Sequence, residues 1–204
     1  MHASTLSQRG YKIFRDWLPS ILLVLLLLVA RSTMADHYHV PSGSMENSLI
    51  PGDHVLVNKA VYGLRIPFTK QVIAPGKDPE AGEVVIFDSP ESGVRLIKRV
   101  VAVGGDHVVL RDGHLFVNGE ALALPSNLGL EQFGERTVAL NLGHGGGPDI
   151  SGMTIPRNFV LVLGDHRGNS HDGRFFGPIP VSEIYGRASA VFWRQGDGPT
   201  WQNL

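Results

Sequence analysis

The stretch HVPSGSMENSLI at residues 39–50 holds three serines around a glycine and a methionine. A serine hydroxyl becomes an effective nucleophile only when a general base lies within hydrogen-bond reach. Ser44 is the candidate nucleophile, and a polar turn leading into a β-strand is the simpler interpretation of the same residues. The presence or absence of a base therefore decides between the two interpretations.

The nine histidines offer no obvious base for Ser44. His54, His107 and His114 lie in or beside segments of alternating hydrophobicity, where exposed polar side chains are expected. No histidine pair has the spacing of a helical zinc motif, and the chain has no cysteine, so we expect neither a metal site nor a cofactor. The sequence GSMEN also lacks the G-x-S-x-G elbow of the α/β-hydrolases. A Ser-His-Asp triad could assemble in space, but no motif points to one.

Lysine is the other possible base, and Lys98 lies inside the apolar segment RLIKRVV. Strand alternation places Lys98 on the same face as Leu96 and Val100. Ile97 and Arg99 then point to the opposite face. Burial lowers the pKa of a lysine, and a value of about 7–8 would let a neutral amine accept the serine proton. An exposed edge-strand lysine, or one half of an ion pair, explains the same spacing, and spacing alone favours that simpler explanation.

A third polar segment, LGDHRGNSHDGRFFGPIP at residues 163–180, follows a predicted strand that ends at Asp165. Its charged side chains can form ion pairs, and Ser170 adds a hydroxyl group. Taken alone, the segment fits an ordered surface loop held by salt bridges. The charged residues concerned are Asp165, Arg167, Asp172 and Arg174.

Short β-branched segments dominate the chain after residue 36, and they must position these groups. The 25 glycines and 13 prolines favour turns, and no sustained helical periodicity is present there. We therefore predict a mostly β domain of coiled antiparallel sheets or a partly open barrel. The predicted strands lie within residues 54–62, 83–89, 94–103, 107–122, 158–165 and 186–194.

Residues 125–150, which include GHGGGPD, interrupt this pattern. Their composition predicts a mobile, loop-rich insertion in the β domain. His144 among these glycines could suggest a metal ligand, but a solvated loop is the favoured interpretation.

An apolar run begins at Trp17, and through Ala35 it spans 19 residues, roughly 28 Å as a helix against a bilayer core of about 30 Å. Arg9, Lys12 and Arg15 precede the run, and positive charge prefers the cytoplasmic side. A cleaved signal peptide is the alternative, and both interpretations place the remaining chain outside the cytoplasm. The predicted division is a cytoplasmic segment at 1–16, a transmembrane anchor at 17–35 and an extracytoplasmic catalytic β domain at 36–204.

Net charge narrows the range of partners. The formal net charge of −1 gives no overall basic field, so we expect no nucleic-acid partner. At 43% hydrophobic residues the chain can bury a core, and its 204 residues suffice for one domain and an anchor.

Taken in order, these segments closely resemble the bacterial type I signal peptidases, also called leader peptidases. That family has a PSGSM box just outside a membrane anchor, followed by GD-x-x-LV-x-K, matched here at residues 52–59. Its KR-V strand is matched at 98–100, and its GDNRDNS-x-DSR loop is matched by GDHRGNSHDGR at 164–174. The ordered set fits over roughly residues 8–193, and it favours a catalytic Lys98 over the simpler explanation.

The resemblance implies a membrane-bound endoprotease with a Ser-Lys dyad. Ser44 matches the nucleophile and Lys98 the general base. Ser42 matches the serine whose hydroxyl forms the oxyanion hole together with the Ser44 backbone N–H. Ser170 matches the hydroxyl that orients the lysine amine.

The remaining matched positions support the loop and the substrate. Asp172 and Arg174 match an ion pair that supports the loop at 164–174. Positions in or near shallow apolar substrate pockets are matched by Val40, Met45, Leu49, Leu96 and Ile97.

The implied function is removal of signal peptides from exported preproteins after a small-x-small motif. The implied partners are these signal peptides and membrane lipid, with the secretion translocon nearby, at the bacterial cytoplasmic membrane. A non-catalytic, membrane-tethered β domain that binds exported chains is an alternative. A self-cleaving Ser-Lys protease of the repressor type is another alternative. The apolar anchor and the absence of a DNA-binding segment argue against it.

Five positions depart from the family pattern. Asn47 and Ser48 stand where proline and threonine are usual, and His166 replaces an asparagine. Gly168 replaces an aspartate and Gly173 a serine. The dyad positions are retained, so we expect activity, while the rigidity of the 164–174 loop is left open.

Overall fold

The computed structural model describes residues 15–24, 35–65 and 72–204. These residues form four antiparallel sheets, and none of the four closes on itself within the described ranges. The predicted mostly β, antiparallel architecture is confirmed, and the open sheets exclude a closed barrel for this part of the chain.

The largest sheet has eight strands and carries most of the groups discussed below. It runs from β1 at one edge to β15 at the other, and β17 pairs with β16 off the main path. In spatial order the strands are β1 (Ala35–His39), β2 (His54–Asn58), β16 (Ile184–Arg194), β5 (Val84–Asp88), β6 (Arg95–Val103), β14 (Phe159–Leu163) and β15 (Ile179–Pro180), with β17 (Gly198–Asn203) beside β16.

Three smaller sheets complete the β structure. Their strands are β13 (Ile150–Thr154), β7 (His107–Arg111), β8 (His114–Val117) and β9 (Glu120–Ala121); β10 (Ala123–Leu124), β11 (Asn127–Phe133) and β12 (Arg136–Ala139); and β3 (Gly63–Arg65) with β4 (Val72–Pro75). Helical turns are short: η1 (Gly43–Met45), η2 (Arg167–Asn169), α2 (Gly173–Phe176) and η3 (Val181–Glu183).

Strands β5 and β6 lie in the middle of the large sheet, which explains their nearly continuous apolar sequences. In their register Lys98 faces Val85, and Arg99 faces Val84. Val85 packs in one buried cluster with Val100, whereas Val84 packs in another with Ile97. Because facing residues of paired strands lie on the same side of a sheet, Lys98 and Arg99 leave β6 on opposite faces.

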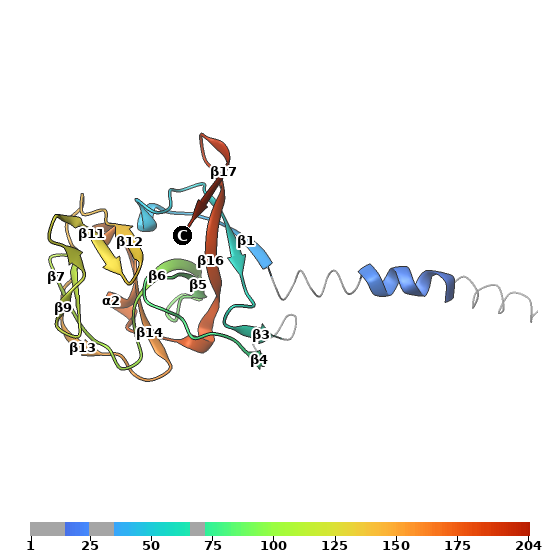
Figure 1. Cartoon of the computed structure of the whole chain (residues 1–204), viewed down its shortest axis with the longest axis horizontal. Helices are drawn as coiled ribbons and strands as arrows, with labels where there is room; N and C mark the ends of the chain where they lie inside the picture. Colours follow the sequence, from blue (N-terminus) through green and yellow to red (C-terminus); the bar gives the residue numbers. More distant parts are fainter. Residues whose placement is uncertain (1–14, 25–34, 66–71) are drawn as a thin grey trace, which may run out of the picture.

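The core surrounds this central pair of strands. In Figure 1, β7, β9, β11 and β12 lie on one side of β6 and β14, while β1, β16 and β17 lie on the other. One buried cluster joins Val101 and Ala102 of β6 to Leu110 of β7, Leu115 of β8 and Phe133 of β11. The strand that carries Lys98 is therefore held from several directions.

The segment at 125–150 differs from the loop-rich insertion predicted from its composition. It contains β11 and β12, and Phe133 and Val138 are buried in the core. Even its glycine-rich part is tied to the rest of the domain, since Arg174 Nη1 donates to Gly146 O at 2.8 Å. Composition was misleading because only a few residues of these strands, among them Glu131, Phe133 and Val138, are buried, and the remaining positions carry glycine and polar side chains.

The predicted span at 17–35 falls largely on residues 25–34, which lie outside the described residues. Residues 15–24 are helical, and the end of the predicted span at Ala35 is the first residue of β1. In the parts of the chain that the structure describes, no helix combines the length and apolar character needed to span a membrane.

Candidate active site

Ser44 lies in the short turn η1, between the edge strand β1 and strand β2. Met45 and Leu49 are fully buried and fix the turn to the core, and Leu49 N donates to Met45 O at 2.8 Å. The turn thereby holds Ser44 in a largely buried position, with 7% of its area exposed. A hydroxyl placed on a turn anchored at its far end is restricted in position but still accessible.

Lys98 reaches Ser44 from the central strand β6. Its Nζ lies 2.6 Å from Ser44 Oγ, and only 3% of the residue is exposed. The two residues are 54 positions apart in the sequence and are brought together by the packing of η1 against β6. This distance suits direct proton transfer between a hydroxyl and an amine.

Burial lowers the pKa of Lys98 from 10.5 to about 8. The carboxylates of Asp172 and Asp165 act in the opposite direction, and the charge of Arg174 lowers the pKa further. Desolvation outweighs the two carboxylates, so a substantial fraction of the amine is neutral at slightly alkaline pH. A neutral amine in contact with a hydroxyl has the chemistry of a general base.

Ser42 precedes the turn in an extended conformation and is exposed. Its Oγ lies 3.4 Å from Ser44 Oγ, so the hydroxyl is beside the candidate nucleophile. A hydroxyl donor beside a reacting serine can stabilise negative charge that develops on a nearby carbonyl oxygen.

Ser170 lies in the loop after β14, next to the turn that carries Ser44. Its Oγ is buried without a hydrogen-bond partner among the described residues, yet its hydroxyl contributes to lowering the pKa of Asp172. A Cβ at Gly164 would overlap Ser170 Oγ and the carbonyl oxygen of Ser44. The absence of a side chain at Gly164 therefore allows this loop to pack directly against the turn that carries Ser44.

The loop is fixed by an ion pair between Asp172 and Arg174, whose shortest separation is 2.8 Å. Asp172 also caps the short helix α2 and accepts a hydrogen bond from Gly164 N at 2.9 Å. Burial raises the pKa of Asp172, but hydrogen bonds and charge from Arg174 outweigh burial and leave the pKa below its ordinary value. The carboxylate stays charged and joins both ends of the loop.

The apolar residues matched to substrate pockets divide between two clusters. Ile97 packs with the fully buried Val40, Met45 and Leu49 in the cluster beneath η1. Leu96 is half-buried and packs in the cluster on the other face of the sheet. The first four lie together behind Ser44, and Leu96 is separated from them.

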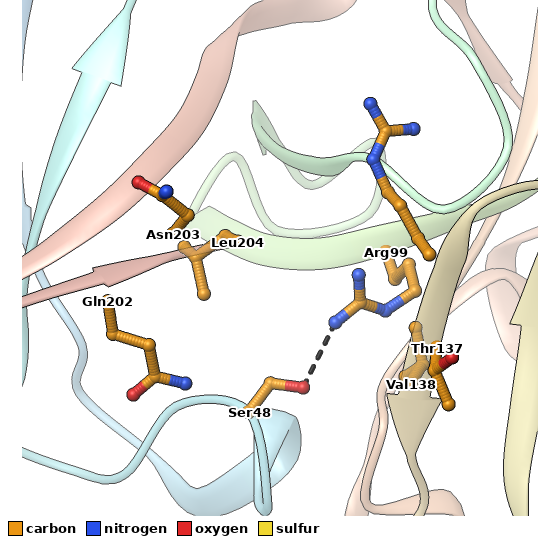
Figure 2. Close-up of a pocket in the computed structure, with 8 residues that line it drawn as sticks. Ser48, Arg99, Thr137, Val138, Gln202, Asn203 and Leu204 are labelled. Carbon is orange, nitrogen blue, oxygen red and sulfur yellow. Dashed lines mark hydrogen bonds between the residues drawn. The ribbon is translucent and has the colours of Figure 1, made fainter.

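Arg99 and Asp165 form a buried ion pair at 2.7 Å that the motif comparison did not assign. Ser48 Oγ donates to Asp165 Oδ2 at 2.6 Å and accepts from Arg99 Nη2 at 3.0 Å. Figure 2 shows this second bond beside a cavity of about 260 Å³, whose lining includes neither Ser44 nor Lys98. The network joins the chain after η1 to β6 and to the start of the 164–174 loop.

Two further partners of the loop come from residues 125–150. Arg167 pairs with the fully buried Glu131 at 2.6 Å, and its guanidinium also donates to Gly113 O. The ring of His144 lies 2.8 Å from that of His166, between Nδ1 and Nε2. No motif in the sequence pointed to either contact, although an arginine and a glutamate in apolar surroundings generally need a charged partner.

Within the described ranges no group of three or more histidine, cysteine or carboxylate side chains is arranged to hold a metal ion. The chemistry available at Ser44 is that of a hydroxyl, an amine whose pKa is lowered to about 8, and hydrogen-bond donors. This set fits nucleophilic attack on a carbonyl group.

Comparison with known proteins identifies relatives over most of the chain. Residues 14–193 match the family described as signal peptidase, peptidase S26. Signal peptidase I of Pseudomonas aeruginosa is 33% identical, over 89% of this chain and 72% of that protein. The probable signal peptidase I-2 of Synechocystis sp. is 31% identical, over 85% of this chain and 70% of that protein. A crystal structure of a signal peptidase I from Enterococcus faecalis V583 is 26% identical, over 55% of this chain and 98% of that chain, with a TM-score of 0.40.

Proposed function

Because the chain belongs to the signal peptidase family of S26 serine peptidases, a family of hydrolases, we propose that it removes signal peptides with a Ser44–Lys98 dyad. The observation that carries the proposal is the 2.6 Å separation of Ser44 Oγ and the buried Lys98 Nζ. Lys98 supplies the base that the histidines of the sequence did not.

The reaction begins when the neutral amine of Lys98 takes the Ser44 proton as Oγ attacks the scissile carbonyl carbon. The oxyanion of the tetrahedral intermediate accepts hydrogen bonds from the Ser42 hydroxyl and the Ser44 backbone N–H. One such donor contributes a factor of about 10²–10³ to kcat. Protonated Lys98 then gives its proton to the leaving amine, and a water activated by the neutral lysine hydrolyses the acyl-enzyme.

Ser170 and the Asp172–Arg174 pair act on Lys98 in this proposal. The buried Ser170 hydroxyl turns toward the amine and fixes its orientation once a substrate excludes water. The ion pair holds the loop that carries Ser170. Each of these roles restricts the amine to positions from which it reaches Ser44.

The substrate is an extended segment with small side chains at the first and third positions before the cleaved bond. An extended chain can bind by adding a strand to an exposed sheet edge. The cluster of Val40, Met45, Leu49 and Ile97 forms the apolar floor of the pockets, and Leu96, which packs on the other face of the sheet, is not part of this floor. Because the floor is already well packed, it admits alanine-sized side chains and excludes large ones.

Residues 17–35 anchor the enzyme in the cytoplasmic membrane in this proposal, with residues 1–16 inside and 36–204 outside. The domain then meets signal peptides where they leave the membrane, close to lipid and to the secretion translocon. Arg9, Lys12 and Arg15 precede the apolar run, and their positive charge favours this orientation because it prefers the cytoplasmic side.

A cleavage assay tests the proposal. The full chain is incubated with a preprotein that carries a small-x-small motif, and the product is identified by mass spectrometry. Ser44→Ala and Lys98→Met should each abolish cleavage, whereas Lys77→Met, which removes an exposed lysine, should not. Full activity in Lys98→Met would exclude the dyad, and binding without turnover in the unaltered chain would indicate a non-catalytic domain.

A further inference from the structure

His166 supports the turn that carries Ser44 through both its backbone and its ring. Its backbone N–H donates to Ser44 O at 3.1 Å. Its Nδ1 lies 3.2 Å from Gly43 O and 3.2 Å from Glu46 Oε2. With 3% of its area exposed, the residue is packed beneath the turn rather than beside it. The carbonyl groups on both sides of the Ser44 Cα are thereby held by one residue.

The other ring nitrogen of His166 faces His144. His144 Nδ1 lies 2.8 Å from His166 Nε2, and His144 is exposed. The two rings have centroids 5.0 Å apart. A continuous series of hydrogen bonds therefore runs from solvent through both imidazoles to the carbonyl of Gly43.

Glycines allow His144 to reach this position. A Cβ at Gly168 would overlap the carbonyl group of His144, so the aspartate usual at that position in the family would not fit. Arg174 Nη1 holds the same loop by donating to Gly146 O at 2.8 Å. His166 and Gly168, two departures from the family pattern, thus both contribute to the contact between His144 and His166.

The number of protons between the rings is limited by the geometry. Nδ1 of His166 faces only acceptors, a carbonyl and a carboxylate, so it carries a hydrogen. A nitrogen-to-nitrogen hydrogen bond holds one hydrogen, which belongs either to His144 Nδ1 or to His166 Nε2. The pair can therefore be neutral or carry one positive charge, but two imidazolium rings would place N–H against N–H.

We propose that His166 is a positioning residue for Ser44 and that its bond to His144 makes this support depend on a single shared proton. The inference rests on the proposed function of Ser44. Among the residues that the structure describes, the charged and titratable groups in contact with the His166 ring are Glu46, on the chain after η1, and His144. Its sequence neighbours are engaged elsewhere, Asp165 with Arg99 and Arg167 with Glu131.

Addition of a second proton to the pair separates the rings and withdraws the support. Glu46 stabilises the first positive charge, because its carboxylate lies against His166 Nδ1. Glu46 does not remove the effect of a second proton, because the two N–H groups would then face each other between the rings. We expect an additional loss of activity of about tenfold when acidification adds this second proton, beyond the loss caused by protonation of Lys98.

Nuclear magnetic resonance tests the shared proton without reference to activity. The full chain, labelled with ¹⁵N at histidine and kept in detergent micelles, should show a scalar coupling between His144 Nδ1 and His166 Nε2. The coupling should disappear when both rings become charged. Two uncoupled rings over the whole pH range would overturn the proposal, and this result would be visible even in an inactive protein.

Substitutions separate the two bonds of the His166 ring. In His166→Asn the amide nitrogen takes the place of Nδ1 and can still donate to Gly43 O, but nothing reaches His144. We expect kcat within about threefold of the unaltered chain and no additional loss at low pH. His166→Ala removes both bonds, and kcat should fall about tenfold with little change in KM.

His144→Ala should also remove the additional loss at low pH, and His107→Ala, an exposed histidine on β7, serves as the matched control. A His144→Ala profile identical to that of the unaltered chain would overturn the proposal. If no variant of Ser44 or Lys98 affects cleavage, the proposed function has failed instead, and the coupling between the rings still decides whether the shared proton exists.

Discussion

Lys98 and Arg99 are neighbours on β6, equally buried, and differ in what their two faces of the sheet offer them. Lys98 and Arg99 have 3% and 4% of their area exposed. Arg99 contacts both oxygens of Asp165, at 2.9 and 2.7 Å, and Gly82 O at 2.6 Å. Lys98 contacts the Ser44 hydroxyl and forms no ion pair among the residues that the structure describes.

The difference shows how burial has opposite consequences for two cations. A buried cation with a carboxylate and a carbonyl as partners is stabilised in its charged form and connects segments of the fold. A buried cation that meets only a hydroxyl is destabilised in its charged form, and its pKa falls. One face of β6 therefore contributes to structure, and the other supplies the proposed base.

The largest expected effect is on activity, from a substitution of Lys98 that leaves the structural face of β6 unchanged. Lys98→Met should lower kcat/KM by a factor of at least about 10²–10⁴, because the proposed general base is lost. Its free energy of unfolding should be unchanged or higher at neutral pH, since an apolar side chain of similar length replaces a buried amine. Cleavage kinetics and urea denaturation of the same sample measure both. A strongly destabilised Lys98→Met would show that the lysine has a structural role instead.

Arg99→Met should lower the free energy of unfolding, in contrast to Lys98→Met. Removing the guanidinium leaves Asp165 buried without its charged partner, and we expect the free energy of unfolding to fall by about 3–5 kcal/mol. Urea denaturation measures the change, with the half-exposed Arg95 replaced by methionine as a control on the same strand. A change as small as that of the control would mean that Asp165 finds another partner.

The pKa of Lys98 predicts a pH dependence of both activity and stability. Only the neutral amine acts as a base, so kcat/KM should fall about tenfold per pH unit below about pH 8. The folded pKa lies below the ordinary value of 10.5, so the unfolded chain binds more protons between these values. Stability should therefore rise from about pH 8 to 10.5 by roughly 3 kcal/mol relative to Lys98→Met. Parallel stability curves for the two proteins would contradict the lowered pKa.

The smallest expected effect is on stability, from a substitution of Ser48 beside the Arg99–Asp165 ion pair. Ser48→Ala removes the hydroxyl that donates to Asp165 and accepts from Arg99, while the ion pair itself remains. We expect a loss of about 1 kcal/mol in the free energy of unfolding and little change in kcat. Ser151→Ala, at an exposed serine of β13, is the control. A loss in kcat of more than tenfold would place Ser48 in the proposed site.

The strands and the order of the motifs could be predicted from the sequence because both depend on local patterns. β6, for example, was predicted within residues 94–103 and spans Arg95–Val103. The proximity of Ser44 and Lys98 could not be derived from spacing, because 54 residues and four further strands separate them. Only the resemblance to a family supplied that pair.

The contacts of residues 125–150 could not be predicted at all. Glu131 and His144 find their partners 36 and 22 residues along the chain, and neither partner carries a local signal for the other. A glycine-rich composition indicates conformational freedom in an unfolded chain, but in this fold it permits close approach of two loops. Gly146 and Gly147 belong to the stretch that predicted mobility, and a Cβ at either position would overlap Gly113 or Arg174, so these glycines allow the loop to pack.

The position of Lys98 in the middle of the large sheet has a consequence for the protein during its synthesis and folding. An exposed lysine in an unfolded chain is almost entirely protonated at neutral pH, and Ser44 is then far from any base. The proposed dyad exists only after β5, β6 and β14 have assembled and excluded water from the amine. The nascent chain is thus its own inactive precursor, and folding does for it what removal of a propeptide does for other proteases.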